Sequence, residues 1–338
     1  MNFVSVGDMA RAFQLRHHSG ALKTQLAQLS DELTTGRKQD TAAALRGDFT
    51  TLGGVEASLA SLKSYKAAAA EATLMVDTMQ AALGSIQSMT ARAGPALIAF
   101  ATTATPESIS AKTADVHDKF MQTITALNSN AGGRYVLSGA ATDRRPVAEG
   151  ADILGWLRTA VSGQLSARDI DTAISAWFDA PAGGGGFVDL AYQGSANPLT
   201  GVPVAPGDIV DLPATATSAE LRNVLKGLAT GALLAEGLLA GDDTERARLT
   251  RLAGERILSA DGGLIALQSQ LGLRQQSIGA AETRNAAETA TMSKVRSALA
   301  EADPYDTATA LEAVRAQIET LHSLTARNAR LSLANYLK

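Results

Sequence analysis

The chain has 338 residues, and its 30 Lys and Arg residues against 34 Asp and Glu residues leave a formal net charge of -4. This near balance argues against nonspecific binding to nucleic acid or anionic membranes, which requires clustered positive charge. The absence of cysteine excludes disulfides, Cys-ligated zinc, iron–sulfur clusters and thiol nucleophiles.

Hydrophobic residues make up 46 % of the chain, but aromatic residues make up only 4 %. This composition is typical of long helices with thin apolar seams. The N-terminal residues lack the apolar stretch of a signal peptide, and we expect none. The longest apolar run, residues 94–106, is too short to span a membrane.

The first predicted helix carries a narrow leucine stripe and ends near residue 35. Its last members follow at alternating spacings of four and three residues, as in a heptad seam. Gly36 is expected to terminate the helix in the left-handed conformation. The stripe consists of Leu15, Leu22, Leu26, Leu29 and Leu33.

A second predicted helix has apolar residues at seven-residue intervals from Val55 to Leu83, with a partner row from Ser58 to Ile86. Gly94 and Pro95 are expected to end it. The next helix is expected to begin at Thr105–Glu107, with Thr as N-cap and Pro in the first turn, and to end near residue 131.

The middle of the chain differs from the flanking arms. Six of the nine prolines and both tryptophans lie between residues 140 and 215. Residues 152–179 suggest one or two packed helices, residues 187–192 a strand, and residues 202–213 two short strands around a Pro-Gly-Asp turn. These elements predict a small inserted domain.

The C-terminal arm is again helical. Helices are expected over residues 217–239, from Asp242 to about Ser259, and from Leu264 to Leu299. Asp303 and Pro304 supply a cap and a first helical position. The last helix carries its own narrow apolar stripe, formed by Leu311, Val314, Ile318, Leu321, Leu331 and Leu337.

Together these patterns predict a mainly α fold: a long antiparallel helical bundle or coiled-coil rod with a small inserted α+β domain. Residues 1–40 and 304–338 would form an axial coiled-coil domain, residues 41–140 and 217–303 a helical rod, and residues 141–216 a β-rich outer domain. Neither terminal stripe can be buried by its own helix. Each must meet the other end of the same chain or the ends of neighbouring copies, and both arrangements remain open on spacing alone.

Motifs that carry catalytic chemistry are not found. The sequence has no P-loop, no nucleophile-elbow motif and no H-E-x-x-H zinc motif. The glycine run 183–186 precedes a strand-like segment and is interpreted as a linker. Asp115 and Asp118, beside His117, have possible ligand spacing, but a solvated helix face is the more economical interpretation. The sequence therefore predicts no enzyme, no cofactor and no metal.

Several segments, taken in order, resemble flagellins and flagellar hook-associated proteins. The segment Leu33–Lys38 is similar to the L-[ST]-[TS]-G-[RK] signature of that superfamily, through Thr35, Gly36 and Arg37. The chain's ending, 331–337, resembles the S-L-x-x-Y-L ending of type 3 hook-associated proteins. A further stretch resembles their F-L-F-S-G-x-x-T-D-x-x-P segment, through Tyr135, Leu137, Ser138, Gly139, Thr142 and Asp143.

This resemblance implies a structural subunit of the flagellum that joins hook to filament. It implies self-association in a helical tube, contact with type 1 hook-associated protein on the hook side and with flagellin on the filament side, and escort by a type III export chaperone. The chain would be secreted without a cleaved signal peptide. A divergent flagellin, and an exported coiled-coil protein of the needle-tip or translocator type, are the alternatives.

Overall fold

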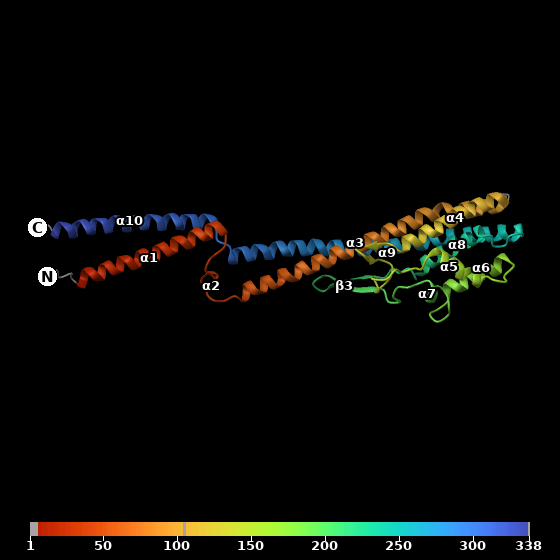
Figure 1. Cartoon of the computed structure of the whole chain (residues 1–338), viewed down its shortest axis with the longest axis horizontal. Helices are drawn as coiled ribbons and strands as arrows, with labels where there is room; N and C mark the ends of the chain where they lie inside the picture. The colour runs from red at the N-terminus through yellow and green to blue at the C-terminus, as the bar shows by residue number, and fades with distance from the viewer. Residues whose placement is uncertain (1–5, 104–105, 337–338) are drawn as a thin grey trace. The chain divides into compact units, whose positions relative to one another are not determined.

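Figure 1 shows a computed structural model of the protein, which describes residues 6–103 and 106–336. The protein is mainly α, as the sequence predicts, and its strands form two small antiparallel sheets. The chain divides into two compact units. The terminal unit comprises the residues up to 62 and from 287 onward, and the central unit comprises residues 63–286.

The terminal unit is built on two long helices, α1 (Val6–Thr35) and α10 (Pro304–Tyr336). They lie antiparallel, so the first turns of α1 and the last turns of α10 are side by side (Figure 1). The short helix α2 (Thr41–Ala44), the first turns of α3 (Thr50–Thr103) and the last turns of α9 (Asp243–Ala300) complete this unit.

The central unit contains the longer parts of α3 and α9, together with the helices and strands between them. Asn130–Ala131 pairs with Arg134–Tyr135, and a longer hairpin follows later in the chain. The remaining elements are α4 (Pro106–Leu127), α5 (Gly150–Ala160), α6 (Ala167–Asp179), α7 (Phe187–Leu190), β3 (Leu199–Ala205), β4 (Asp208–Leu212) and α8 (Ala219–Ala235).

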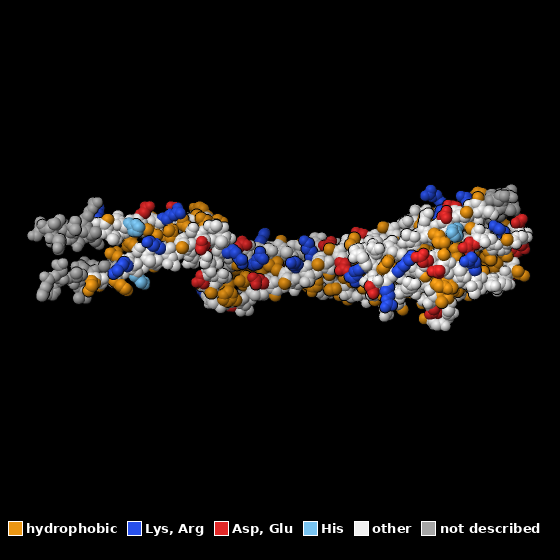
Figure 2. Space-filling model, viewed as in Figure 1, with side chains coloured by type: hydrophobic (Ala, Val, Ile, Leu, Met, Phe, Trp, Pro, Cys, Tyr) orange, Lys and Arg blue, Asp and Glu red, His pale blue; other side chains and the backbone are white. Residues whose placement is uncertain are grey.

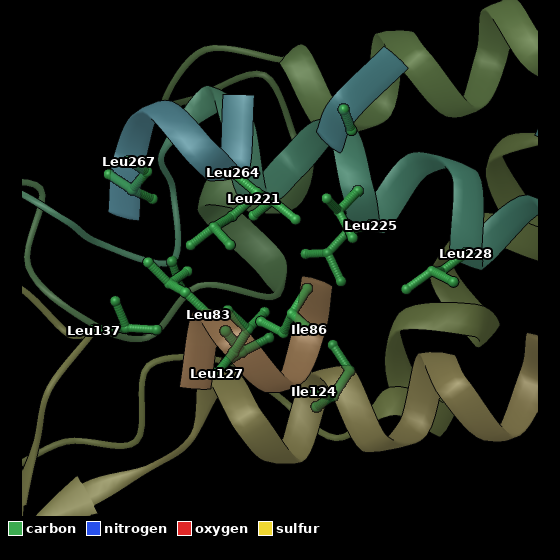
Figure 3. Close-up of a cluster of buried hydrophobic side chains, with 14 of the residues drawn as sticks. Leu83, Ile86, Ile124, Leu127, Leu137, Leu221, Leu225, Leu228, Leu264 and Leu267 are labelled. Atoms are coloured by element: carbon green, nitrogen blue, oxygen red, sulfur yellow. The ribbon is translucent and has the colours of Figure 1, made fainter. Parts of the chain in front are cut away.

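The core of the central unit lies where four helices converge (Figure 3). Leu83 and Ile86 of α3 point toward Leu127 of α4, and Leu221 of α8 and Leu264 of α9 close the cluster. All five side chains are at most 1 % exposed. Burying one such side chain contributes about 1.5–3 kcal/mol. The predicted heptad rows of α3 therefore face this core, as Val76, Met79, Leu83 and Ile86 are all fully buried.

The expected helix end at Gly94 and Pro95 is wrong, because α3 continues to Thr103 with Pro95 inside it. Pro95 and Ala91, whose carbonyl loses its partner, both lie on the exposed face, where water can replace the missing bond. Gly94 is buried against α9: a Cβ there would lie 3.0 Å from the carbonyl oxygen of Gly254. The glycine serves a close helix crossing.

The expected break between residues 259 and 264 is also wrong, since α9 is one helix of 58 residues. Gly262 and Gly263 each cost about 1 kcal/mol relative to alanine in a helix interior. The fully buried Leu264 and nearly buried Ala260 on either side outweigh this cost. Gly263 also admits α8, because a Cβ there would approach the Glu220 side chain at 3.1 Å.

Residues 187–190 form the short helix α7 and not the predicted strand. The Asp189 carboxylate accepts hydrogen bonds from the backbone N–H groups of Gly183 and Gly185, at 2.9 and 2.7 Å, which curls the glycine run into a turn. These bonds lower the pKa of Asp189. Phe187 then packs against Trp177 and Phe178, with ring centroids 6.1 and 5.3 Å away.

The predicted hairpin between residues 202 and 213 is confirmed as β3 and β4, joined at a turn in which Gly207 has a φ of 77°. It is fastened to α9 by Asn285, whose side-chain amide donates to the carbonyl of Val204 at 2.7 Å. Arg284 forms an ion pair with Asp208 at the same place. The buried polar residue Asn285 of α9 thus holds the hairpin.

Candidate assembly surface of the terminal helices

The two terminal helices meet along a single apolar seam. Leu22 of α1 is 5 % exposed and packs with Val314 and Leu321 of α10. Leu15, Leu26, Leu29 and Ile318 lie half-buried around them. Leu311 is also buried. The seam brings together residues nearly 300 positions apart in the chain.

Other members of the two predicted stripes lie elsewhere. The Leu33 side chain is 42 % exposed. Leu331 belongs to the last turns of α10, where the structure describes the backbone alone. Leu337 lies outside the described residues.

A two-helix pair has only one internal face, and apolar side chains remain on its outside. Met9 and Phe13 of α1 are 58 % and 65 % exposed, and Leu324 of α10 is 48 % exposed. Hydrophobic, basic and His side chains are visible together on this part of the molecule in Figure 2. Large exposed apolar side chains on a marginal helix pair are typical of an association surface.

The Thr35–Lys38 segment forms the joint between α1 and the start of α10. Gly36 has the predicted left-handed conformation, with a φ of 68°, and its N–H donates to the carbonyl of Glu32. The Gly36 carbonyl then accepts from the N–H of Ala302 at 3.1 Å, and the Lys38 N–H donates to the carbonyl of Ala300 at 3.1 Å. Arg37 pairs with Glu301 in this two-strand contact. The motif thus ties the α1 end to the α9–α10 connection.

The start of α10 is capped as predicted. The Asp303 carboxylate accepts backbone N–H bonds from Tyr305 and Asp306, at 2.8 and 3.2 Å, while Pro304 occupies the first helical position. An N-cap carboxylate of this kind contributes about 1 kcal/mol.

An open groove of about 590 Å³ lies at this joint. Its apolar lining includes Leu29, Ala298 and Pro304. Its acidic lining consists of Glu32, Glu301, Asp303 and Asp306, and Lys38 is the basic residue beside them. Glu32 and Asp303 are already occupied by hydrogen bonds within the chain, whereas Glu301 and Asp306 are exposed.

The Tyr135–Asp143 segment forms a structural joint in the central unit. Leu137 is fully buried in the core, and its carbonyl accepts from the N–H of Ala216 at 2.9 Å. Ser138 and Gly139 contact residues 195–197: a Cβ on Gly139 would lie 2.4 Å from the Asn197 carbonyl oxygen, so only glycine fits. This segment therefore joins the two ends of the inserted residues.

The remaining residues of that segment support the joint. Tyr135 donates its N–H to the Thr142 carbonyl at 2.7 Å, and the Ser138 hydroxyl donates to the Tyr135 carbonyl at 3.0 Å. The Thr142 hydroxyl accepts from the Arg134 side chain. Asp143 is exposed.

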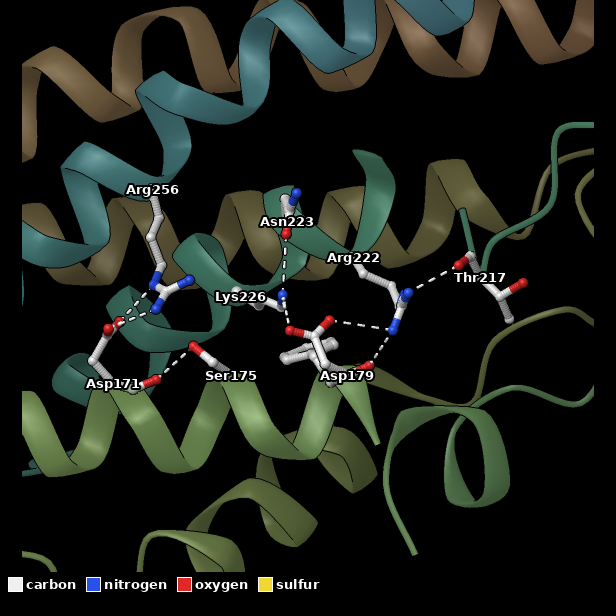
Figure 4. Close-up of polar contacts among 9 residues, drawn as sticks. Asp171, Ser175, Asp179, Thr217, Arg222, Asn223, Lys226 and Arg256 are labelled. Carbon is white, nitrogen blue, oxygen red and sulfur yellow. Dashed lines mark hydrogen bonds and ion pairs between the residues drawn. The ribbon is translucent and has the colours of Figure 1, made fainter. Parts of the chain in front are cut away.

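Helix α6 is fastened to α8 and α9 by ion pairs (Figure 4). Asp171 accepts two hydrogen bonds from the guanidinium of Arg256, at 2.5 and 2.6 Å, and this partner raises the pKa of Arg256. Asp179 contacts Lys226 at 2.6 Å and Arg222 at 3.2 Å. The Lys226 side chain is only 5 % exposed, so this contact holds a charge that would be costly to bury alone.

The sequence did not predict these ion pairs. Asp171 and Arg256 lie 85 residues apart, and Asp179 and Lys226 lie 47 residues apart, without a periodic pattern that links them. Sequence reasoning also missed the exposed Met9 and Phe13, which lie outside the leucine stripe, and the acidic groove. The groove left a signal in the sequence, namely the excess of acidic residues near positions 31 and 303.

Within residues 6–103 and 106–336, three or more His, Asp or Glu side chains do not gather in a way that could hold a metal ion. None of the helices described has a segment sufficiently long and apolar to cross a membrane.

Comparisons with known proteins identify the fold. No protein-family model matches the chain, and no curated protein sequence matches it. Among solved structures, FlgL of Bacillus cereus is similar at a TM-score of 0.50 and 14 % identity, over 72 % of this chain and 100 % of FlgL. A putative flagellar hook-associated protein of Vibrio parahaemolyticus is similar at 0.50 and 13 % identity, over 75 % of this chain and 98 % of that one. The chain shares their fold.

Proposed function

We propose that this chain is a structural subunit of the bacterial flagellum that connects the hook to the filament. The observation that carries the proposal is the shared fold with FlgL over nearly three quarters of the chain. The proposal is supported by the terminal helix pair, which buries one seam and leaves Met9, Phe13 and Leu324 exposed for contacts with other subunits.

In this proposal residues 1–40 and 304–338 form the axial part of a tube, residues 41–140 and 217–303 the surrounding helical part, and residues 141–216 the outer part. The partners are further copies of this chain, type 1 hook-associated protein on one side and flagellin on the other. The chain leaves the cell through the flagellar type III apparatus with a chaperone, and it acts without catalysis.

The seam residues are proposed to act in assembly through their own helix pair. Leu22, Val314 and Leu321 hold α1 against α10, and this pairing presents the outer side chains to neighbouring subunits. The residues of the Thr35–Arg37 and Tyr135–Asp143 motifs are proposed to have structural roles at the two joints described above, and not to contact a ligand.

Deletion of the gene tests the proposal. Cells without a junction protein should have hooks but no filaments and should release flagellin monomers into the medium, and the intact gene should restore filaments. Capped hooks with no released flagellin would instead identify the chain as a filament subunit. Normal filaments in the deletion strain would refute both roles.

A further inference from the structure

The two ends of the terminal helix pair carry opposite charge. Residues 6–30 and 313–336, here called the basic end, contain six Lys and Arg residues against two Asp and Glu residues, for a net charge of +4. Residues 31–40 and 301–312, the acidic end, contain seven Asp and Glu residues against two Lys and Arg residues, for a net charge of -5. The overall balance of the chain conceals this asymmetry.

The two ends of one copy meet at their boundary, where Arg315 forms an ion pair with Glu312 at 2.9 Å, but their outer charges are well separated. Arg16 and Glu32 lie 16 positions apart in α1. At a rise of 1.5 Å per residue this is about 24 Å along the helix axis. Surface charges are screened over about 8 Å at physiological salt. Each end therefore presents its own field to a neighbour.

The shapes of the two ends are also complementary. The acidic end is hollowed by the groove, which has Pro304 and Ala310 in its lining and Glu301 and Asp306 exposed beside them. The basic end projects Phe13, which is 65 % exposed and stacks on His17. A protruding apolar side chain among cations fits an apolar groove among carboxylates.

We propose that neighbouring copies of this chain pack in parallel with an axial stagger of about 24 Å, estimated from the helical rise, so that the basic end of one copy lies against the acidic groove of the next. The inference rests on the proposed function, since a tube built from one kind of subunit orients all its copies alike. Packing without stagger would set +4 against +4 and -5 against -5. The stagger sets each end against its opposite.

Cross-linking tests the stagger directly, because the native chain has no cysteine. His17→Cys marks the basic end and Ala298→Cys marks the groove, and both positions are exposed. The purified full-length variants, concentrated at low salt and treated with a short bismaleimide, should give dimers when mixed and few when alone. Dimers from each variant alone, without mixed dimers, would show packing in register and overturn the inference.

Charge exchange tests the cause. Glu301→Lys with Asp306→Lys in the groove variant, or Lys23→Glu with Arg327→Glu in the His17→Cys variant, should each lower the mixed cross-link at least fivefold. The two reversed variants mixed together should restore it. Glu56→Lys with Glu288→Lys changes the net charge equally at exposed sites outside both ends and should leave the cross-link unchanged.

Circular dichroism of each variant verifies that its helices are intact. The neutral substitutions Glu301→Gln and Asp306→Asn, made together, should give a loss of mixed cross-link intermediate between the native charges and their reversal. Cross-linking that ignores charge reversal overturns the inference. A full-length chain that forms no cross-link in any combination also overturns it, whereas the junction role is decided separately by the deletion strain.

Discussion

Replacing Leu321 by Asp should unfold the terminal helix pair and leave the central unit intact. Leu321 is 8 % exposed and is one of three buried residues at the centre of the seam. Losing its burial removes about 1.5–3 kcal/mol, and a carboxylate between Leu22 and Val314 adds a desolvation cost of similar size. A pair of helices with a single seam has little stability in reserve.

The expected signal can be worked out from the helix lengths. Helices α1 and α10 have 30 and 33 residues, and together they hold about a quarter of all helical residues. If the pair unfolds as a unit, Leu321→Asp should therefore remove about a quarter of the circular dichroism signal at 222 nm. Both tryptophans, Trp156 and Trp177, lie in the central unit. Tryptophan fluorescence during thermal unfolding should therefore be the same as in the unmodified protein.

Leu324→Asp is the matched control, because Leu324 lies on the same helix three positions away and is 48 % exposed. It should leave the helical signal and the fluorescence transition unchanged, because surface substitutions alter the free energy of unfolding by at most about 0.5 kcal/mol. The reasoning is refuted if Leu321→Asp leaves the helical signal unchanged. It is also refuted if the fluorescence transition shifts as well, since the two units would then unfold together.

Three further predictions concern the central unit. Asp171→Asn should lower the free energy of unfolding by about 2 kcal/mol, because it leaves the Arg256 guanidinium without its ion-pair partner. Glu255→Gln, in the exposed pair with Arg251, should lower it by at most about 0.5 kcal/mol. Urea unfolding followed by fluorescence measures both. Gly254→Ala should lower the free energy of unfolding by at least about 2 kcal/mol, since its Cβ would lie 2.8 Å from a backbone oxygen of α3. Gly262→Ala, where a Cβ would meet open space, should raise it by about 0.5–1 kcal/mol. An equal effect of the two substitutions would contradict the close crossing of α3 and α9. Burial raises the pKa of Tyr192 to about 12. The neutral phenol therefore stabilises the folded state below pH 10, and this contribution to the free energy of unfolding should be lost as the pH rises from 10 to 12. The free energy of unfolding of Tyr192→Phe should decline less over that range.

Features that depend on local periodicity and local chemistry could be predicted from the sequence. The heptad row of α3 from Val55 to Leu83 is buried because a helix places every seventh residue on one face. Gly36 adopts a positive φ and Asp303 caps α10 because both effects act within one helical turn. The charge asymmetry of the terminal segments also follows from counting residues, although its meaning depends on the antiparallel pairing.

Other features depended on contacts between distant segments. Pro95 and Gly262 have poor helix propensity, costing about 1–3 kcal/mol, but α3 and α9 pass through them because buried residues on both sides contribute more. The 187–190 segment is helical because Asp189 holds the glycine loop and Phe187 meets two aromatic rings. No sequence pattern links Asp171 to Arg256. Tertiary structure decided these points because packing energies summed over many distant contacts exceed local preferences of a few kcal/mol.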